Sequence, residues 1–181
     1  MCTAKTLRLI VVAGTPGTGK TTVAKRIAFK TCSELIESDK YWEELFPDPR
    51  YSASESMAVF ECVAKNVEAR LQRGESIIAD GVFASRSRIE LLNTLACRYH
   101  ANFHIVVLHS SWDDALARMQ LRMAASGRAL TPKDRWFALK AKLEEWIGEY
   151  RPLTIDTTHC SVEDIMNSVW DALAQNPRAH D

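Results

Sequence analysis

Residues Gly14 to Thr21 carry the clearest chemical signal in this 181-residue chain. They fit the pattern G-x-x-x-x-G-K-[ST], in which the backbone amides of a glycine-rich loop surround the phosphate groups of a nucleotide. Lys20 is expected to pair with the β- and γ-phosphates, and Thr21 is expected to place its hydroxyl on Mg²⁺. The predicted nucleotide-binding residues are Gly14, Thr15, Pro16, Gly17, Thr18, Gly19, Lys20, Thr21 and Thr22.

The segments on either side of this loop favour the same interpretation. Residues 7–13 are nearly all apolar, which predicts a buried strand entering the loop, and a helix is expected from Lys20 to about Lys30. This order directs loop N–H groups and the positive end of the helix toward phosphate oxygens. The alternative is a plain glycine turn before a helix.

Asp80 is the next residue with expected chemistry, because it follows the apolar strand predicted over residues 76–79, beside the loop. A carboxylate at this position can hold a water molecule of the Mg²⁺ shell or assist an acceptor hydroxyl. Thr21 and Asp80 are therefore the residues predicted to bind the metal. The alternative is that Asp80 is only a turn residue paired with Gly81.

Three arginines are expected to supply positive charge from a movable segment. Arg118 and Arg122 are one helical turn apart and share a face, and Arg128 follows the Ser126-Gly127 break. Such a group can neutralise charge on a phosphoryl group during transfer. The alternative is a solvated basic stripe on a helix surface.

Strands and helices alternate along the chain, which predicts one α/β domain over residues 1–181. Single crossover helices between strands require a parallel sheet, so we expect three α/β/α layers with five parallel strands and helices on both faces. Two segments, about 40–73 and 118–135, are longer than a single helix between two strands requires. They are expected to cover an acceptor and to form a lid, respectively.

Charge and composition restrict the partners. The chain has 23 Lys and Arg against 23 Asp and Glu, so no broad field favours a long nucleic acid or an anionic membrane. The longest aliphatic run, residues 9–13, is far shorter than the ~20 residues that span a bilayer, and no cleavable signal is recognisable. The five cysteines are widely spaced and lack a Cys-x-x-Cys pair, which predicts reduced thiols and a cytoplasmic location.

Two classes of nucleotide-hydrolysing protein are disfavoured. The chain has no Asn-Lys-x-Asp motif of the kind that reads guanine in Ras-type GTPases. Asp80 is followed by Gly81, whereas ATP-driven motors usually carry a glutamate at that place. Phosphoryl transfer to a bound acceptor remains, a reaction in which the protein positions two substrates and spreads charge.

With these motifs in order, the chain resembles the small P-loop kinases related to polynucleotide 5′-hydroxyl kinases, zeta toxins and chloramphenicol phosphotransferase, a group often described as AAA-family ATPases. The resemblance implies ATP and Mg²⁺ as cofactors and a nucleoside-kinase-like P-loop NTPase fold with a helical lid. The matching segments are Gly14–Thr21, Ser38-Asp39, Ile77–Phe83 with Arg86 and Arg88, the arginines 118, 122 and 128, and Ile155–His159.

Within this resemblance, Asp39 matches the carboxylate that takes the proton of the acceptor hydroxyl. An acid at a strand end facing the phosphate loop is also where in-line attack needs a proton acceptor. The alternative is that Asp39 caps a helix beginning near Lys40. Polynucleotide kinases have an arginine three residues after this acid, where this chain has Trp42, and this departure disfavours recognition of a nucleic-acid 3′-phosphate or backbone.

The segment after Asp39 is rich in aromatic residues, which suits a ring-bearing or amphiphilic acceptor, although these side chains can equally serve packing alone. Its basic residues between positions 40 and 60 are Lys40 and Arg50, which favours an uncharged acceptor over a phosphate-bearing one. The residues of this segment that are expected to line the acceptor pocket are Tyr41, Trp42, Phe46, Arg50, Tyr51 and Phe60.

The predicted function is that of an ATP- and Mg²⁺-dependent kinase that phosphorylates a hydroxyl of a small molecule. The alternatives are a nucleotide or polynucleotide 5′-hydroxyl kinase and an NTP-binding regulatory module with little turnover. The expected partners are a nucleoside triphosphate and the acceptor, without a membrane or a long nucleic acid, and no oligomeric state is indicated. The predicted catalytic residues are Lys20, Asp39, Asp80, Arg118, Arg122 and Arg128.

Overall fold

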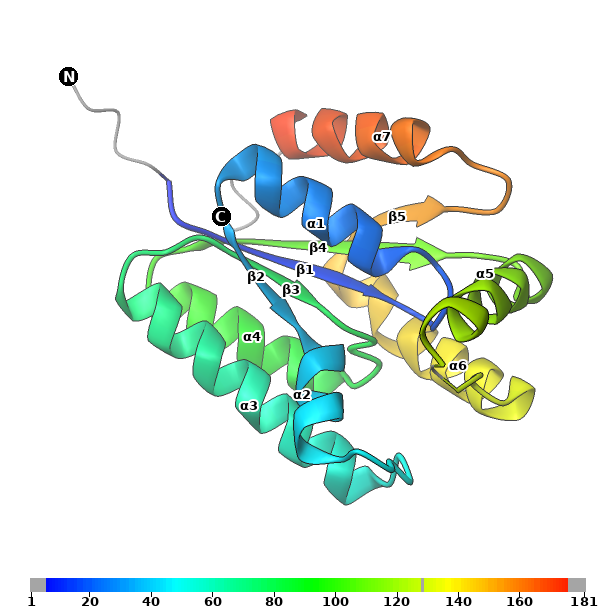
Figure 1. Cartoon of the computed structure of the whole chain (residues 1–181). Coiled ribbons are helices and arrows are strands. Elements are labelled where there is room, and N and C mark those ends of the chain that lie inside the picture. Colours follow the sequence, from blue (N-terminus) through cyan, green and yellow to red (C-terminus); the bar gives the residue numbers. More distant parts are fainter. Residues whose placement is uncertain (1–5, 128, 176–181) are drawn as a thin grey trace.

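The computed structural model describes residues 6–127 and 129–175, so Arg128 lies outside the described residues. Within them, strands and helices alternate almost throughout, as the sequence predicts (Figure 1). In chain order they are β1 (Arg8–Gly14), α1 (Lys20–Thr31), β2 (Glu34–Glu37), α2 (Ser38–Leu45), α3 (Ala53–Gln72), β3 (Ile77–Asp80), α4 (Arg86–Arg98), β4 (Asn102–His109), α5 (Trp112–Ser126), α6 (Lys133–Tyr150), β5 (Leu153–Asp156) and α7 (Val162–Gln175).

The strands form one five-stranded sheet in the order β2-β3-β1-β4-β5, and every neighbouring pair is parallel. In this register Asp80 of β3 lies beside Val12 of β1 on one side and beside Glu37 of β2 on the other. The carboxyl ends of these three strands therefore meet at one edge of the sheet, which is where open α/β sheets bind ligands.

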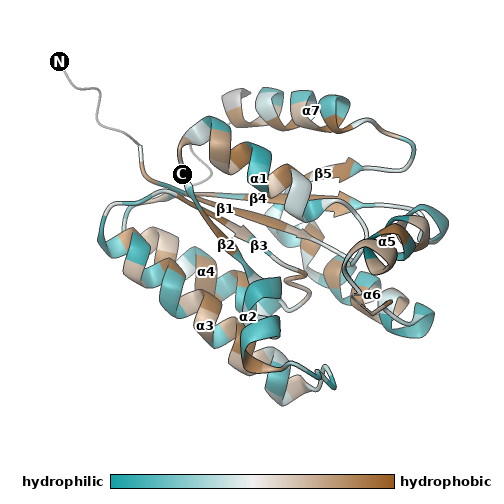
Figure 2. Cartoon of the chain, in the orientation of Figure 1, coloured by the Kyte–Doolittle hydropathy of each residue, from teal (hydrophilic) through white to brown (hydrophobic). Residues whose placement is uncertain are grey.

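Helices cover both faces of the sheet, because alternate residues of each buried strand are apolar on both sides. Along β1, Leu9 and Val11 pack into the core beneath α3, α4 and α6, whereas Ile10 and Val12 pack against α1 and α7. Figure 1 shows these two helix layers above and below the sheet, and Figure 2 shows the apolar strands between them. The predicted three-layer fold is confirmed.

Two helices begin with side-chain caps that fix the entry of the chain into the site region. At α3, Ser52 and Glu55 form a capping box, in which each side chain accepts a hydrogen bond from the other residue's backbone N–H. At α5, Ser111 accepts from the backbone N–H of Asp114. Helix α5 lies beyond the carboxyl ends of β1 and β4, and its Ala115 and Met119 form one buried apolar cluster with Trp136 of α6.

No helix in the described ranges, 6–127 and 129–175, is long and apolar enough to cross a membrane. The cytoplasmic location and the extent of the domain over residues 1–181 stay predictions.

Candidate active site

The phosphate loop connects β1 to α1 in a conformation that only glycine tolerates at two positions. At Gly14, with φ +149°, a Cβ atom would lie 2.4 Å from the Leu108 carbonyl oxygen. At Gly17, with φ +86°, it would lie 2.5 Å from the Ala115 carbonyl oxygen of α5. The loop backbone therefore lies in close contact with β4 at Gly14 and with α5 at Gly17, which explains why these two positions are glycine.

Side chains from α5, from α6 and from the residue after β5 hold this loop through its carbonyl groups. Trp136 of α6 donates its indole N–H to the Pro16 carbonyl at 2.9 Å. Arg118 of α5 approaches the Gly17 carbonyl at 3.4 Å and donates to Thr157 at 3.0 Å (hydroxyl) and 2.7 Å (carbonyl). The Thr157 hydroxyl lies 3.2 Å from the Thr18 carbonyl. The loop is therefore tied to α5, to α6 and to the residue that follows β5.

Lys20 and Thr21 open helix α1 beneath the loop. The Lys20 ammonium donates to the Thr15 carbonyl at 2.8 Å, so its charge lies against the loop. The Thr21 hydroxyl donates to Asp80 Oδ2 at 2.6 Å. The structure brings together the two residues that the sequence assigns to the metal, from segments 59 positions apart.

Asp80 is 3% exposed, and burial raises its pKa to about 6, although the Lys20 charge and the Thr21 hydrogen bond act in the opposite direction. Its second oxygen, Oδ1, is buried and has no hydrogen-bond partner in the part of the chain that the structure describes. A buried oxygen of this kind is costly unless a ligand or water satisfies it. A threonine hydroxyl and a carboxylate are oxygen donors of the kind Mg²⁺ prefers, so the residues fit this ion.

Asp39 lies in the first turn of α2 and lines the same cleft as Lys20 and Asp80. The helix begins at Ser38, and its N-cap is Glu37, which forms no side-chain capping bond. The alternative interpretation of Asp39 as an N-cap is therefore wrong. Its negative charge contributes to the raised pKa of Asp80 after the larger effect of burial, which indicates that the two carboxyl groups are close.

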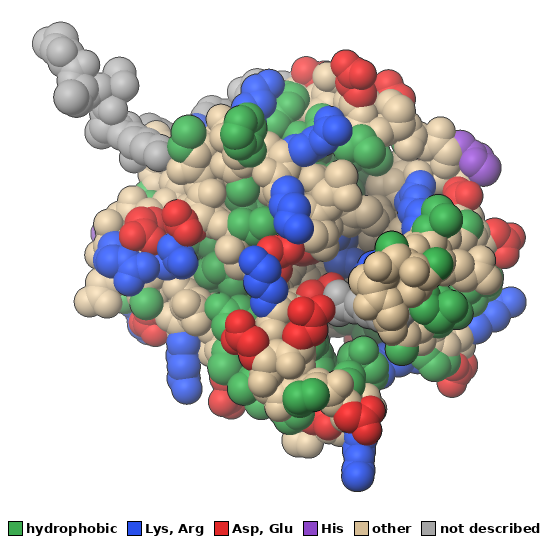
Figure 3. All heavy atoms as spheres, viewed as in Figure 1, with side chains coloured by type: hydrophobic (Ala, Val, Ile, Leu, Met, Phe, Trp, Pro, Cys, Tyr) green, Lys and Arg blue, Asp and Glu red, His purple; other side chains and the backbone are tan. Residues whose placement is uncertain are grey.

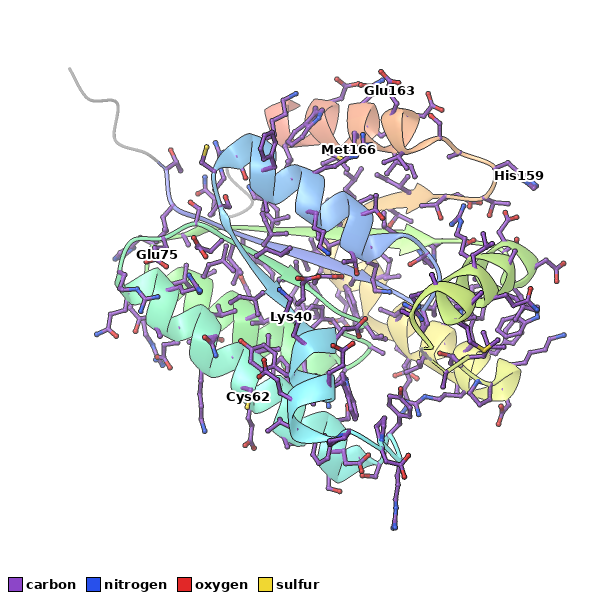
Figure 4. The ribbon with its side chains drawn as sticks, viewed as in Figure 1. Lys40, Cys62, Glu75, His159, Glu163 and Met166 are labelled. Atoms are coloured by element: carbon purple, nitrogen blue, oxygen red, sulfur yellow. The ribbon has the colours of Figure 1, made fainter. Side chains whose placement is uncertain are left out.

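Glu37 is a further charged residue at this edge, and it was not predicted from the sequence. It is 9% exposed and forms ion pairs with Lys40 at 2.7 Å and with Lys25 at 3.2 Å. Burial opposes its ionisation, but the two ammonium groups together lower its pKa. Figure 4 shows Lys40 at the start of α2, and Lys25 comes from α1. The signal available in the sequence was a third acid at a strand end, two residues before Asp39.

One cleft of about 880 Å³ joins the phosphate loop to the segment after Asp39. Arg118 and Arg122 line it from α5, and residues 129–132 also line it. Figure 3 shows basic and acidic side chains next to one another in the region between α1 and α2. Arg128, the third arginine of the predicted lid, lies outside the described residues.

The aromatic segment divides into residues that line the cleft and residues that do not. Trp42, Tyr51 and Phe60 line it, and the rings of Trp42 and Tyr51 are 4.9 Å apart. Tyr41 packs against the core instead. Phe46 contacts Trp42 from outside the cleft lining. The expected acceptor segment therefore contributes an apolar wall to the cleft.

Two arginines with no predicted role also reach the cleft. Arg88 of α4 donates to the Ser56 hydroxyl at 2.9 Å and lies 5.1 Å from the Phe60 ring. Arg135 of α6 stacks over Tyr51, with its guanidinium carbon 4.2 Å from the ring centroid. Arg88 belongs to the segment that carried the family resemblance, but the sequence did not indicate which of its arginines faces inward.

A family model for an AAA domain matches residues 9–146, so the chain belongs to that AAA-domain family. Uncharacterised proteins of Mycobacterium bovis and Mycobacterium tuberculosis are 25% identical over 166 residues, which cover 84% of this chain and 32% of theirs. The chain thus spans about a third of the length of these curated relatives.

Solved structures confirm the P-loop kinase fold. A gluconokinase from Sinorhizobium meliloti 1021 is similar with a TM-score of 0.70 and 21% identity, covering 93% of this chain and 92% of that one. A sugar kinase from Janibacter sp. HTCC2649 is similar with a TM-score of 0.69 and 20% identity, covering 97% and 99%.

Proposed function

We propose that this member of the AAA-domain family is an ATP- and Mg²⁺-dependent phosphotransferase that moves the γ-phosphoryl group to a hydroxyl of a small molecule. The observation that carries the proposal is the single cleft that contains the phosphate loop, Asp80 and Asp39 and then continues along an aromatic wall. A module that only binds nucleotide needs the first half of this cleft. The second half offers room for an acceptor beside a carboxylate.

In the proposed reaction, the loop amides and Lys20 bind the phosphates of ATP. Thr21 and Asp80 would hold Mg²⁺, which supplies positive charge to the phosphate oxygens. The acceptor oxygen forms a bond to the γ-phosphorus as the bond to the bridging oxygen of the leaving ADP breaks. Asp39 orients the acceptor hydroxyl and takes its proton.

The arginines of α5 have different proposed contributions. Arg118 is already bound to Gly17 and Thr157, so it holds the loop while keeping its charge near the phosphates. Arg122 lines the cleft one turn further along the helix and contacts the transferring group when the segment 118–135 closes as a lid. Arg128 is proposed to act with it. The named activities of the two solved neighbours, gluconokinase and sugar kinase, support an acceptor of small size.

The test is a phosphotransfer screen with labelled ATP against pools of metabolites, antibiotics, nucleosides and oligonucleotides, with the wild-type chain and the Lys20→Ala variant in parallel. Lys20-dependent transfer to a metabolite or antibiotic hydroxyl supports the proposal. Transfer confined to nucleotides would instead indicate a nucleotide kinase, and transfer confined to oligonucleotide 5′-hydroxyls would indicate a polynucleotide kinase. ATP binding without transfer to any pool would favour a regulatory module.

A further inference from the structure

We propose that the acceptor carries an anionic group, a carboxylate or a phosphate, and that Arg88 and Arg135 bind it at the acceptor end of the cleft. This inference rests on the proposed function and deepens it. It replaces the expectation of an uncharged acceptor. That expectation rested on the small number of basic residues between positions 40 and 60. The two arginines come instead from α4 and α6, and tertiary packing brings them to the start of α3.

Arg88 is a half-buried guanidinium whose charge has no counter-charge among the described residues. The Ser56 hydroxyl is its hydrogen-bond acceptor, and the face of Phe60 covers it. Burial lowers its pKa, and no carboxylate opposes that effect. Arg86 shows the contrast, because it lies two residues earlier on the same helix and forms ion pairs with Glu90 and Glu149 at the surface.

Arg135 reaches the same end of the cleft from the first turn of α6. Its guanidinium stacks on Tyr51, and burial lowers its pKa while Tyr51 and Glu55 act in the opposite direction. The carboxylate of Glu55 accepts backbone hydrogen bonds from Ser52 and Arg50 and serves the cap of α3. Because Arg135 lies near Glu55 and Arg88 contacts Ser56, the two guanidinium groups flank neighbouring positions of one helix.

The chemistry of the ligand follows from this arrangement. A guanidinium has five N–H donors in a planar fork, and Arg88 uses one of its two terminal nitrogens on Ser56. The remaining donors match the two oxygens of a carboxylate or phosphate, which also neutralises a half-buried charge that is costly when unpaired. An acceptor held by its anion at Arg88 and Arg135 can extend along the aromatic wall and present its hydroxyl to Asp39.

The experiment uses the full chain and matched acceptors that differ in charge: sugar acids, sugar phosphates and the parent neutral sugars. We expect kcat/KM to favour an anionic member over its neutral counterpart by about 10²-fold, since a site built for a charged group rejects the analogue lacking it. The sugar-acid and sugar-phosphate arms distinguish a carboxylate from a phosphate as the recognised group. ATP affinity, measured by calorimetry, reports on the nucleotide half independently.

Variants then assign the effect to the arginines. Arg88→Gln should raise the KM of the anionic acceptor by about 10- to 100-fold with ATP affinity within about twofold of wild type, and Arg88→Lys should recover part of the loss. Arg135→Gln should act in the same direction. Arg86→Gln is the matched control on the same helix and should leave the KM unchanged.

The inference is overturned if neutral acceptors are used as well as anionic ones, or if Arg88→Gln and Arg86→Gln behave alike. It is also overturned if Ser56→Ala reproduces the Arg88→Gln defect, because the arginine would then serve packing alone. Failure to use any anionic compound, with Lys20-dependent ATP binding intact, rejects the anionic acceptor and leaves the kinase proposal standing. Absence of ATP binding rejects both.

Discussion

The two halves of the cleft are built by different means. The nucleotide half consists mainly of backbone groups from one continuous segment, residues 14–21, held in place by Trp136, Arg118 and Thr157. The acceptor half consists of side chains from α2, α3, α4 and α6 and from the segment between α2 and α3, including the rings of Trp42, Tyr51 and Phe60. Phosphate groups are the same in every nucleotide, so a local loop suffices to bind them. Recognition of one acceptor requires side chains that tertiary packing brings together.

The largest effect is expected from Lys20→Ala, which breaks the nucleotide half. Lys20 supplies a full positive charge on the loop, whereas the amides supply only partial charges. We expect transfer to fall by a factor on the order of 10³ or more, together with weaker ATP binding, since the charge acts on the phosphates before and during transfer.

Steady-state kinetics and calorimetry measure the two effects. The matched control is Lys30→Ala, at the far end of the same helix, where the ammonium lies 4.5 Å from the Trp170 ring. Unchanged ATP affinity and turnover in Lys20→Ala would remove the assignment of the phosphate loop.

Asp39→Asn should separate the two halves, because it removes the proton acceptor and leaves the loop intact. We expect kcat to fall by a factor on the order of 10²–10⁴ while the Kd for ATP stays near the wild-type value. Single-turnover kinetics should place the loss in the chemical step. A normal kcat combined with a lower free energy of unfolding would show that Asp39 serves only the first turn of α2.

Arg122→Ala should reduce kcat by about 10²-fold and leave ADP affinity nearly unchanged, because its charge is needed when the γ-phosphoryl group is in transfer. Arg122→Lys should restore only part of the rate, since an ammonium cannot form the bidentate hydrogen bonds of a guanidinium.

Arg118→Ala should instead lower nucleotide affinity and Tm, because Arg118 joins Gly17 to Thr157 through hydrogen bonds.

Hydrogen exchange with a non-hydrolysable ATP analogue tests the lid directly. Residues 118–127 and 129–135 should gain protection on binding if the segment closes. Equal protection in the free and bound states, or equal losses of ADP and ATP affinity in Arg122→Ala without slower transfer, would contradict the lid mechanism.

The fold and the nucleotide half could be predicted because their signals are local. Alternation of apolar strands and helices indicated the parallel sheet, and the glycine pattern indicated the loop. Thr21 was assigned from the loop motif and Asp80 from its place after an apolar strand, and the structure joins the two side chains by a 2.6 Å hydrogen bond. The catalytic roles of these residues stay predictions.

The acceptor half could not be predicted in the same way, because the sequence does not show which face of a helix is turned inward. Arg86 and Arg88 are two residues apart and chemically identical, yet one pairs with surface glutamates and the other faces the cleft. Arg118 looked like a free lid charge from its helical spacing alone. Its bonds to Gly17 and Thr157 depend on the packing of α5 beside the loop and the end of β5.

The last effect, on stability and not on the rate of transfer, concerns Asp80, at the boundary between the two halves. Its folded pKa of about 6 is above the ordinary value of 3.8, so folding favours the protonated form. Well below pH 3.8 the carboxyl is protonated in both states and does not lower the free energy of unfolding. Between pH 4 and 6 the unfolded chain ionises first, so the nucleotide-free protein loses stability as pH rises, by at most about 3 kcal/mol at 1.4 kcal/mol per pKa unit.

Asp80→Asn should therefore unfold at a higher urea concentration than wild type at pH 8, with the difference shrinking toward pH 4. Saturating Mg²⁺ and ADP should reverse that order, because the ionised carboxylate then has a cation to bind. A stability difference that is the same at pH 4 and pH 8 would show that burial of Asp80 carries no ionisation cost.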